Sequence, residues 1–166
     1  MDSESLKTLQ APLKQQYKDD PEAAVITLKA TSTGSDGVAC KLETGKGMIE
    51  AGLHPATGGS GMEACSGDML LEALVACAGV TLQAVSTAFG VSLTRSEISA
   101  EGDLDFRGTL GIGKDAPVGF RDIRMFFDID GDASSETLDK IIELTERYCV
   151  VLQTIEQKPP INLSRI

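Results

Sequence analysis

Tryptophan is absent from this 166-residue sequence, histidine occurs once, and phenylalanine and tyrosine together make up only 4% of it. Positive charge is also scarce. The chain has 15 lysine and arginine residues against 25 aspartate and glutamate residues, which gives a net charge of −10 at pH 7. Nucleic acids and anionic membrane surfaces are bound by basic faces. We therefore expect neither a nucleic acid nor a membrane among the partners of this protein.

The sequence also lacks a recognisable targeting or membrane-spanning segment. Its N-terminus, MDSESLKTLQ, has neither the basic nor the apolar region of a secretory signal peptide. The apolar run over residues 69–90 contains Glu72 and Gln83. A spanning helix needs about 20 predominantly apolar residues with few or no charges. These features predict a cytoplasmic protein.

Four cysteines are present, Cys40, Cys65, Cys77 and Cys149, and their spacings contain no paired CxxC motif of the kind that binds zinc. In a reducing compartment they are not expected to form a structural disulfide framework. That leaves buried packing residues or a redox pair. His54 could join Cys65 and Cys77 at a metal ion, but nothing in the spacing supports such a site, and we expect no metal and no cofactor.

The order of the expected elements indicates an α+β protein. An amphipathic helix broken near Pro12 is expected over residues 5–18. The other expected elements are a hairpin of strands over 22–29 and 38–45, a third strand over 47–53, and two long strands over 91–106 and 120–130. This order lacks the regular βαβ repeat of a parallel sheet. The length predicts a single domain, residues 1–166, with residues 1–21 as an N-terminal helical extension.

Two helices are signalled by their ends. For the long central helix, Ser66 or Asp68 is a suitable N-cap, and Gly90 after Phe89 is suited to the C′ position. The sequence between them is apolar nearly all round, which predicts a buried helix. Ser134 is expected to cap a second helix, and the segment after the next proline pair, residues 161–166, is short enough for an edge strand.

Cys77 lies in the middle of the central apolar run, in ALVACAG. A lone cysteine in a buried, alanine-rich helix is usually a small packing residue. Two features favour a chemical role instead. Glu72 lies five residues earlier, in a face otherwise free of charge, and Cys149 follows the second helix in ERYCVV. A further helical turn after Cys149 could present its N-terminal amides to a thiolate.

These residues together resemble a known family. SGDMLLEALVACAG, then roughly 70 residues of two long strands and a helix, and then ERYCVV are similar to the OsmC/Ohr family of organic hydroperoxide reductases. The resemblance covers about residues 22–166. The order of elements matches, as do a first cysteine in the central helix and a second cysteine at a helix-to-helix junction.

The resemblance implies a fold and a chemistry. The fold would be an intertwined homodimer in which antiparallel sheets wrap long central helices, with two active sites at the subunit interface. Cys77 would be the peroxidatic thiol, which attacks an organic hydroperoxide and becomes a sulfenic acid, and Cys149 would condense with it to a disulfide. A dithiol of the lipoyl type would then regenerate the pair.

The sequence departs from the family pattern at several positions. The family also uses an arginine from the N-terminal portion and a glutamate ten residues before the first cysteine. Here no arginine precedes Arg95, and the tenth residue before Cys77 is Gly67, followed by Asp68. Val150 stands where a proline usually follows the second cysteine. These departures indicate a divergent branch of the family.

Asp68 and Glu72 are candidates for orienting the thiols. Arg147, with Lys18 and Arg95 as alternatives, is a candidate for the missing arginine.

Two functions therefore compete. The first is a thiol-dependent peroxidase that reduces organic hydroperoxides through Cys77 and Cys149. The alternative is a noncatalytic dimer of the same fold that binds a small apolar ligand or senses redox state.

Overall fold

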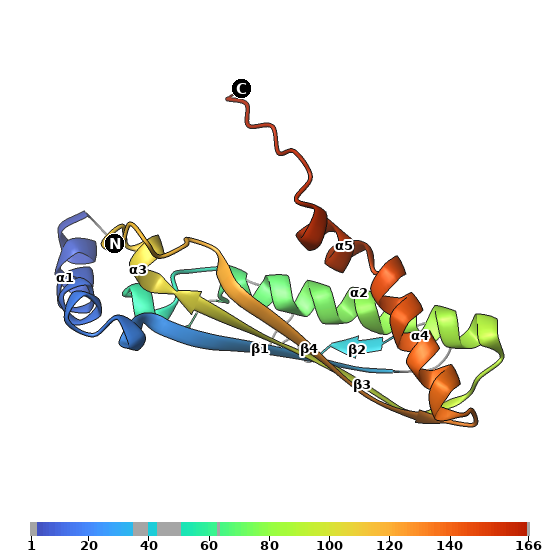
Figure 1. Cartoon of the computed structure of the whole chain (residues 1–166). Helices are drawn as coiled ribbons and strands as arrows, with labels where there is room; N and C mark the ends of the chain where they lie inside the picture. The colour runs from blue at the N-terminus through green and yellow to red at the C-terminus, as the bar shows by residue number, and fades with distance from the viewer. Residues whose placement is uncertain (1–2, 35–39, 43–50, 63, 166) are drawn as a thin grey trace. The chain divides into compact units, whose positions relative to one another are not determined.

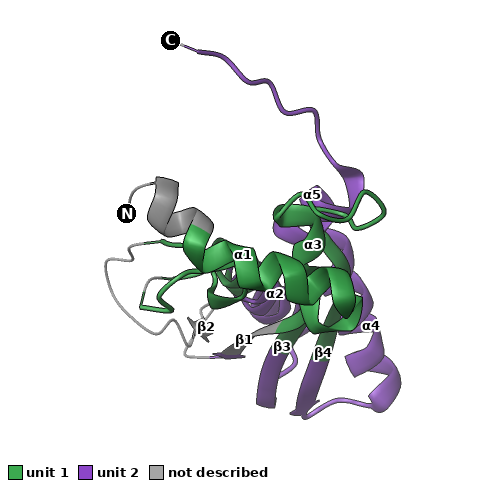
Figure 2. Ribbon diagram, turned by 90° about the vertical axis from the view of Figure 1, so that its left-hand side faces the viewer, with its two compact units in different colours: residues 1–31, 43–72, 99–126 green, residues 32–42, 73–98, 127–166 purple. Residues whose placement is uncertain are grey.

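The computed structural model describes residues 3–34, 40–42, 51–62 and 64–165. The chain divides into two compact units (Figure 2), each made of three segments. Unit 1 comprises residues 1–31, 43–72 and 99–126. Unit 2 comprises residues 32–42, 73–98 and 127–166. Each unit is described by itself below.

A four-stranded sheet runs in the order β2-β1-β3-β4 (Figure 1). Its strands are β1 (Val25–Gly34), β2 (Cys40–Leu42), β3 (Leu93–Asp105) and β4 (Phe120–Gly131). The first two pair antiparallel, with Thr33 opposite Lys41. The expected hairpin and the two expected long strands are therefore present. The expected third strand over 47–53 lies mostly outside the described residues, and its described part contributes an isolated bridge from Ala51 to Ala64.

Helices lie before, between and after these strands along the chain. They are α1 (Ser3–Asp19), the short 3-10 helices η1 (Pro21–Ala24) and η2 (Pro55–Thr57), α2 (Ser66–Phe89), α3 (Phe106–Thr109), α4 (Ser135–Tyr148) and α5 (Val150–Gln157). The α+β class expected from the sequence is confirmed. The single domain expected over residues 1–166 stays a prediction.

The core of unit 1 contains α1, the expected N-terminal extension. Tyr17 of α1, Ala24 and Phe106 are its buried apolar residues. The Tyr17 hydroxyl donates a hydrogen bond of 2.8 Å to the Ala56 carbonyl, which ties α1 to η2. Leu13 packs against the same cluster. These contacts explain why α1 continues through Pro12, where a break was expected.

Unit 2 is built around the larger part of α2. Its fully buried side chains include Leu74 and Leu82 of α2, Ile98 of β3 and Ile141 of α4. Helix α4 begins as expected, because the Ser134 hydroxyl accepts a hydrogen bond from the Thr137 amide. Burying apolar side chains of this size stabilises a fold by about 1.5–3 kcal/mol each.

Gly90 ends helix α2 with a left-handed φ of 67°, as expected. The N-terminal expectation was wrong: Ser66 is the first helical residue and Asp68 lies in the first turn, so neither is the N-cap, and the Cys65 carbonyl accepts the first helical hydrogen bond, from the Met69 amide. The burial of α2 also differs from the expectation. One side is buried, but the other carries a row of exposed residues at helical spacing, here called the exposed stripe: Met69, Ala73, Val80, Ala84 and Thr87. Within one chain, α2 is therefore buried on one side only.

By length and composition, α2 is also the one described helix that could cross a membrane, and 39% of that apolar stretch is buried inside the chain. Core helices of soluble proteins pass the same test.

The C-terminal segment differs from the expectation. Residues 158–165 form no strand, and Ile161 and Leu163 are 82% and 91% exposed. An edge strand needs the free backbone groups of a neighbouring strand, and no described strand pairs with this segment.

Candidate thiol site

Cys77 lies in the middle of α2, four residues after Ala73 and three before Val80 of the exposed stripe. Because residues three and four apart share one face of a helix, Cys77 belongs to this stripe. Its side chain is a free thiol and is partly exposed. Part of the residue is therefore open to solvent in the single chain.

Cys149 lies at the junction of α4 and α5, where it is both the last cap of one helix and the first cap of the next. Its backbone is held from both sides: the Cys149 amide donates to the Thr145 carbonyl, and the Cys149 carbonyl accepts from the Gln153 amide, each at 2.9 Å. Its side chain is a free thiol with no exposed surface. The residue is fixed and shielded from solvent.

The two thiols are neighbours within unit 2. Burial is the main reason that the pKa of Cys149 rises to about 11, and the adjacent Cys77 side chain adds to this rise. The backbone amides of Leu152 and Val151, at the start of α5, act in the opposite direction. The Cys149 side chain accepts no capping hydrogen bond at the start of α5. Cys149 therefore keeps its proton at neutral pH.

This arrangement combines a reachable thiol with a shielded, protonated one. A protonated Cys149 beside Cys77 can donate an S–H to the Cys77 sulfur. After oxidation of Cys77, the same neighbour is placed to form a disulfide. The pair that the sequence singled out is brought together by the fold.

The two acidic candidates are not brought to Cys77 by their helix. At about 100° per residue, Asp68 is rotated about 180° and Glu72 about 140° from Cys77 around the axis of α2. Asp68 is partly buried, which raises the pKa of its carboxyl, while the nearby charge of His54 acts against this rise. Asp68 thus belongs to the surroundings of His54.

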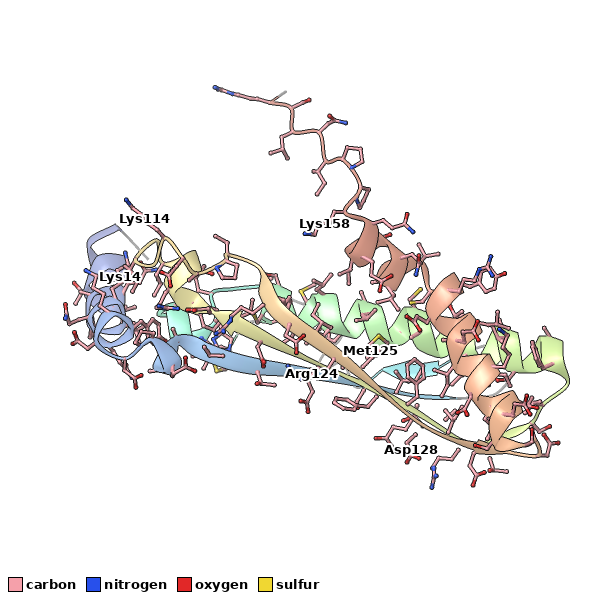
Figure 3. The ribbon with its side chains drawn as sticks, in the orientation of Figure 1. Lys14, Lys114, Arg124, Met125, Asp128 and Lys158 are labelled. Carbon is pink, nitrogen blue, oxygen red and sulfur yellow. The ribbon has the colours of Figure 1, made fainter. Side chains whose placement is uncertain are left out.

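The arginine candidates in unit 2 have other partners. The Arg147 guanidinium lies over the Tyr148 ring, 5.5 Å from its centroid. The Arg95 side chain pairs with Asp128 of β4, labelled in Figure 3, at 2.8 Å, and both side chains are largely exposed. Among the described residues, neither arginine has a recorded contact with a thiol. Lys18 lies in unit 1, at the end of α1.

Unit 1 contains arginines that the sequence analysis did not single out. Arg124 of β4 (Figure 3) pairs with Asp103 at 2.8 Å. The hydrogen bonds that Arg124 and Thr27 donate to Asp103 lower the pKa of this carboxyl to about 2. Arg107 pairs with the buried Asp105 at 2.6 Å. Each guanidinium is neutralised by a carboxylate, so this cluster supports the sheet and α3.

A pocket of about 380 Å³ in unit 1 was also not anticipated. His54 and Cys65 line it together with a largely apolar wall that includes Leu70, Leu104, Phe106 and Phe120. The His54 ring stacks on Phe106 at 4.9 Å, and its Nδ1 accepts a hydrogen bond from the Ala56 amide. These residues come from η2, α2, α3 and the long strands, so no local spacing in the sequence reveals the pocket.

No group of three or more metal-ligating side chains occurs among the residues that the structure describes. The cysteines are therefore considered as thiols.

Comparisons with known proteins agree with the fold. No curated protein sequence matches the chain. The crystal structure of an OsmC-like hydroperoxide resistance protein from Jannaschia sp. CCS1 is similar, with a TM-score of 0.59 and 14% sequence identity over 83% of this chain and 91% of that one. At this identity the similarity concerns the fold. The sequence model of the family described as OsmC-like protein matches residues 59–164, a range that contains Cys65, Cys77 and Cys149. The chain therefore belongs to the OsmC-like protein family.

Proposed function

We propose that this protein is a thiol-dependent peroxidase that reduces organic hydroperoxides through Cys77 and Cys149. One observation carries the proposal: the partly exposed thiol of Cys77 has the buried, protonated thiol of Cys149 as its neighbour. Membership of the OsmC-like family and the similarity to a hydroperoxide resistance protein support it.

The reaction follows from the two environments. The Cys77 thiolate attacks one oxygen of the hydroperoxide, the O–O bond breaks, and the alcohol leaves with a proton, so that Cys77 becomes a sulfenic acid. The Cys149 sulfur then attacks the Cys77 sulfur, water leaves, and a disulfide forms. A dithiol, which we propose to be of the lipoyl type, gives two electrons and two protons to restore both thiols.

The surroundings of Cys77 favour an organic hydroperoxide over hydrogen peroxide. The exposed stripe beside Cys77 consists of methionine, alanine, valine and threonine, and carries no charge. An alkyl group can lie along such a surface, since burial of apolar area from water is favourable.

The proposed oligomer is a homodimer in which a second copy of the chain covers the part of the exposed stripe that follows Cys77, at Val80, Ala84 and Thr87, and leaves the Cys77 side open to substrate. This arrangement would place Cys77 beside the subunit interface.

The decisive experiment is a thiol count with disulfide mapping, before and after one equivalent of cumene hydroperoxide. We expect rapid loss of two thiols per chain and a Cys77–Cys149 disulfide. The Cys77→Ser variant should show no rapid loss of thiols, because it lacks the nucleophile. The Cys65→Ser variant is the matched control and should behave as the wild type, since Cys65 lies in the pocket of unit 1. Thiols that remain unchanged in the wild type would refute the peroxidase.

The pocket in unit 1 favours a second candidate, a noncatalytic protein that binds a small apolar ligand. Its volume lies within the range of small-molecule sites, about 300–1,000 Å³. Saturation-transfer NMR with octanol tests this function. Val118 is 68% exposed at the pocket wall, so a Val118→Arg variant should fold and lose the signal. The candidate would be rejected if the octanol saturation-transfer signal were absent, or were equal in the wild type and the variant.

A further inference from the structure

We propose that the reducing thiol attacks the sulfur of Cys77, not that of Cys149, and that Cys149 is the leaving group. This inference rests on the proposed function, because it concerns the disulfide that the peroxidase reaction would leave. It assigns the two sulfurs different roles in the reductive half of the cycle.

Access is the first argument. A thiolate that cleaves a disulfide must reach one of its two sulfurs, and the choice depends on which of them is accessible. Cys77 is partly exposed on the exposed stripe of α2. Cys149 has no exposed surface. A reductant that approaches along α2 meets Cys77 first.

The backbone around Cys149 strengthens this argument. The hydrogen bonds to Thr145 and from Gln153 hold the residue at the junction of α4 and α5. Thr145, one turn earlier, is itself fully buried. Exposure of the Cys149 sulfur would require these bonds and this packing to open, which costs free energy before any reaction. Attack on Cys77 requires no such opening.

The leaving group provides an opposing effect. A thiol with a high pKa leaves slowly, and burial raises the pKa of Cys149. Part of this rise comes from the Cys77 thiol, and that part disappears once Cys77 carries the reductant. The amides of Val151 and Leu152 remain beside the Cys149 sulfur and stabilise its negative charge. We infer that access decides the direction and that the leaving group only slows the step.

The electrons balance in two steps. The first thiolate of the reductant bonds to the Cys77 sulfur, the disulfide breaks, and Cys149 leaves with the electron pair and takes up a proton. The second thiol of the reductant then attacks the reductant's first sulfur, which is bonded to Cys77 in the mixed disulfide. Cys77 leaves as a thiolate, and the reductant departs as a disulfide.

The test uses a Cys40→Ser/Cys65→Ser protein, in which Cys77 and Cys149 are the remaining cysteines. The disulfide is made with diamide, exposed briefly to mercaptoethanol and quenched in acid, and free thiols are then alkylated in denaturant. Peptide mass spectrometry should find mercaptoethanol on Cys77 and the alkyl group on Cys149, in at least about tenfold excess over the reverse. An excess of the adduct on Cys149, or equal amounts, would overturn the inference.

A second measurement separates access from the leaving group. In the same background, the variants Cys149→Ser and Cys77→Ser each carry thionitrobenzoate on the remaining cysteine, so the leaving group is identical. Mercaptoethanol should release it from Cys77 at least about tenfold faster than from Cys149, and the difference should vanish in denaturant. Equal rates in the folded proteins would contradict the inference.

These outcomes are distinct from a failure of the proposed function. Diamide forms the disulfide without hydroperoxide, so a protein that ignores hydroperoxides still reports which sulfur is attacked. A failure of diamide to join Cys77 to Cys149 would overturn the inference itself.

Discussion

Cys77 and Cys149 carry the same side chain in two different environments. Cys77 can be reached from solvent, whereas Cys149 is enclosed, and burial raises its pKa to about 11. A thiol is a good nucleophile only where it can ionise and be reached. The pair therefore divides into a thiol suited to attack an external molecule and a thiol suited to react only with its neighbour.

The raised pKa of Cys149 predicts how the reduced protein responds to alkaline pH. In the unfolded chain a cysteine titrates near pH 8.5, and in the folded chain Cys149 titrates at about 11. Below the unfolded value both states hold the proton, and the stabilising contribution is fully present. As the pH rises toward 11, only the unfolded state loses the proton, so the free energy of unfolding should fall.

Urea unfolding under reducing conditions at about pH 7, 9 and 10 measures this effect, because this range crosses the titration of the unfolded chain and stays below that of folded Cys149. The Cys149→Ala variant is the control, because it lacks the thiol whose titration is tested. The stability of the wild type relative to the variant should decline with rising pH. A constant difference would show that the pKa of Cys149 is not raised in the folded chain.

Sequence reasoning identified the two thiols but not the groups around them. Cys77 stood out because it lies in the middle of the central apolar run, and Cys149 because it directly follows the second helix. Asp68 and Glu72 were chosen for their closeness in sequence, yet the helical period turns both away from Cys77. The partner of Arg95, Asp128, is set by pairing of distant strands, which no local pattern contains.

At the scale of elements, α4 connects the Ser134 cap at one end to Cys149 at the other. Ser134→Ala removes the side-chain acceptor for the Thr137 amide, and we expect a loss of about 1 kcal/mol in the free energy of unfolding, typical of N-cap serines. Ser134→Asp should retain most of the stability, since a carboxylate accepts the same hydrogen bond. Urea unfolding of the three proteins measures this, and equal midpoints for Ser134→Ala and the wild type would contradict it.

The ends of helices were predictable because caps are local. Ser134 and Gly90 act through backbone groups within four residues, so the sequence nearby contains the whole signal. Pro12 and the C-terminal segment were not predictable in this way. Helix α1 passes through Pro12 because Leu13 and Tyr17 pack on distant residues. Ile161 and Leu163 alternate like a strand but have no described strand to pair with.

At the scale of the whole molecule, the exposed stripe of α2 is the main departure from the sequence expectation. The helix was expected to be buried nearly all round, yet Val80 is 43% exposed in the single chain. Tyr148 and Val150, on either side of Cys149, are 57% and 70% exposed. Exposed apolar surfaces of this kind mark sites of association. Both predictions, a buried helix and a homodimer, are reconciled if a second chain covers the stripe.

This reconciliation makes a prediction about mass and activity together. A chain of 17.5 kDa should sediment as a dimer of about 35 kDa, twice the chain mass. Val80→Lys places a charge in the stripe, and because burial of an unpaired charge is costly, the variant should sediment as a monomer. Gln16→Lys is the control, since it adds the same charge on an exposed position of α1, outside residues 59–164 of the family match. It should remain dimeric.

If the active sites depend on the interface, Val80→Lys should also form the Cys77–Cys149 disulfide more slowly with hydroperoxide, while its circular dichroism stays that of a folded protein. A Val80→Lys protein that remains dimeric would show that the stripe is not the dimer interface.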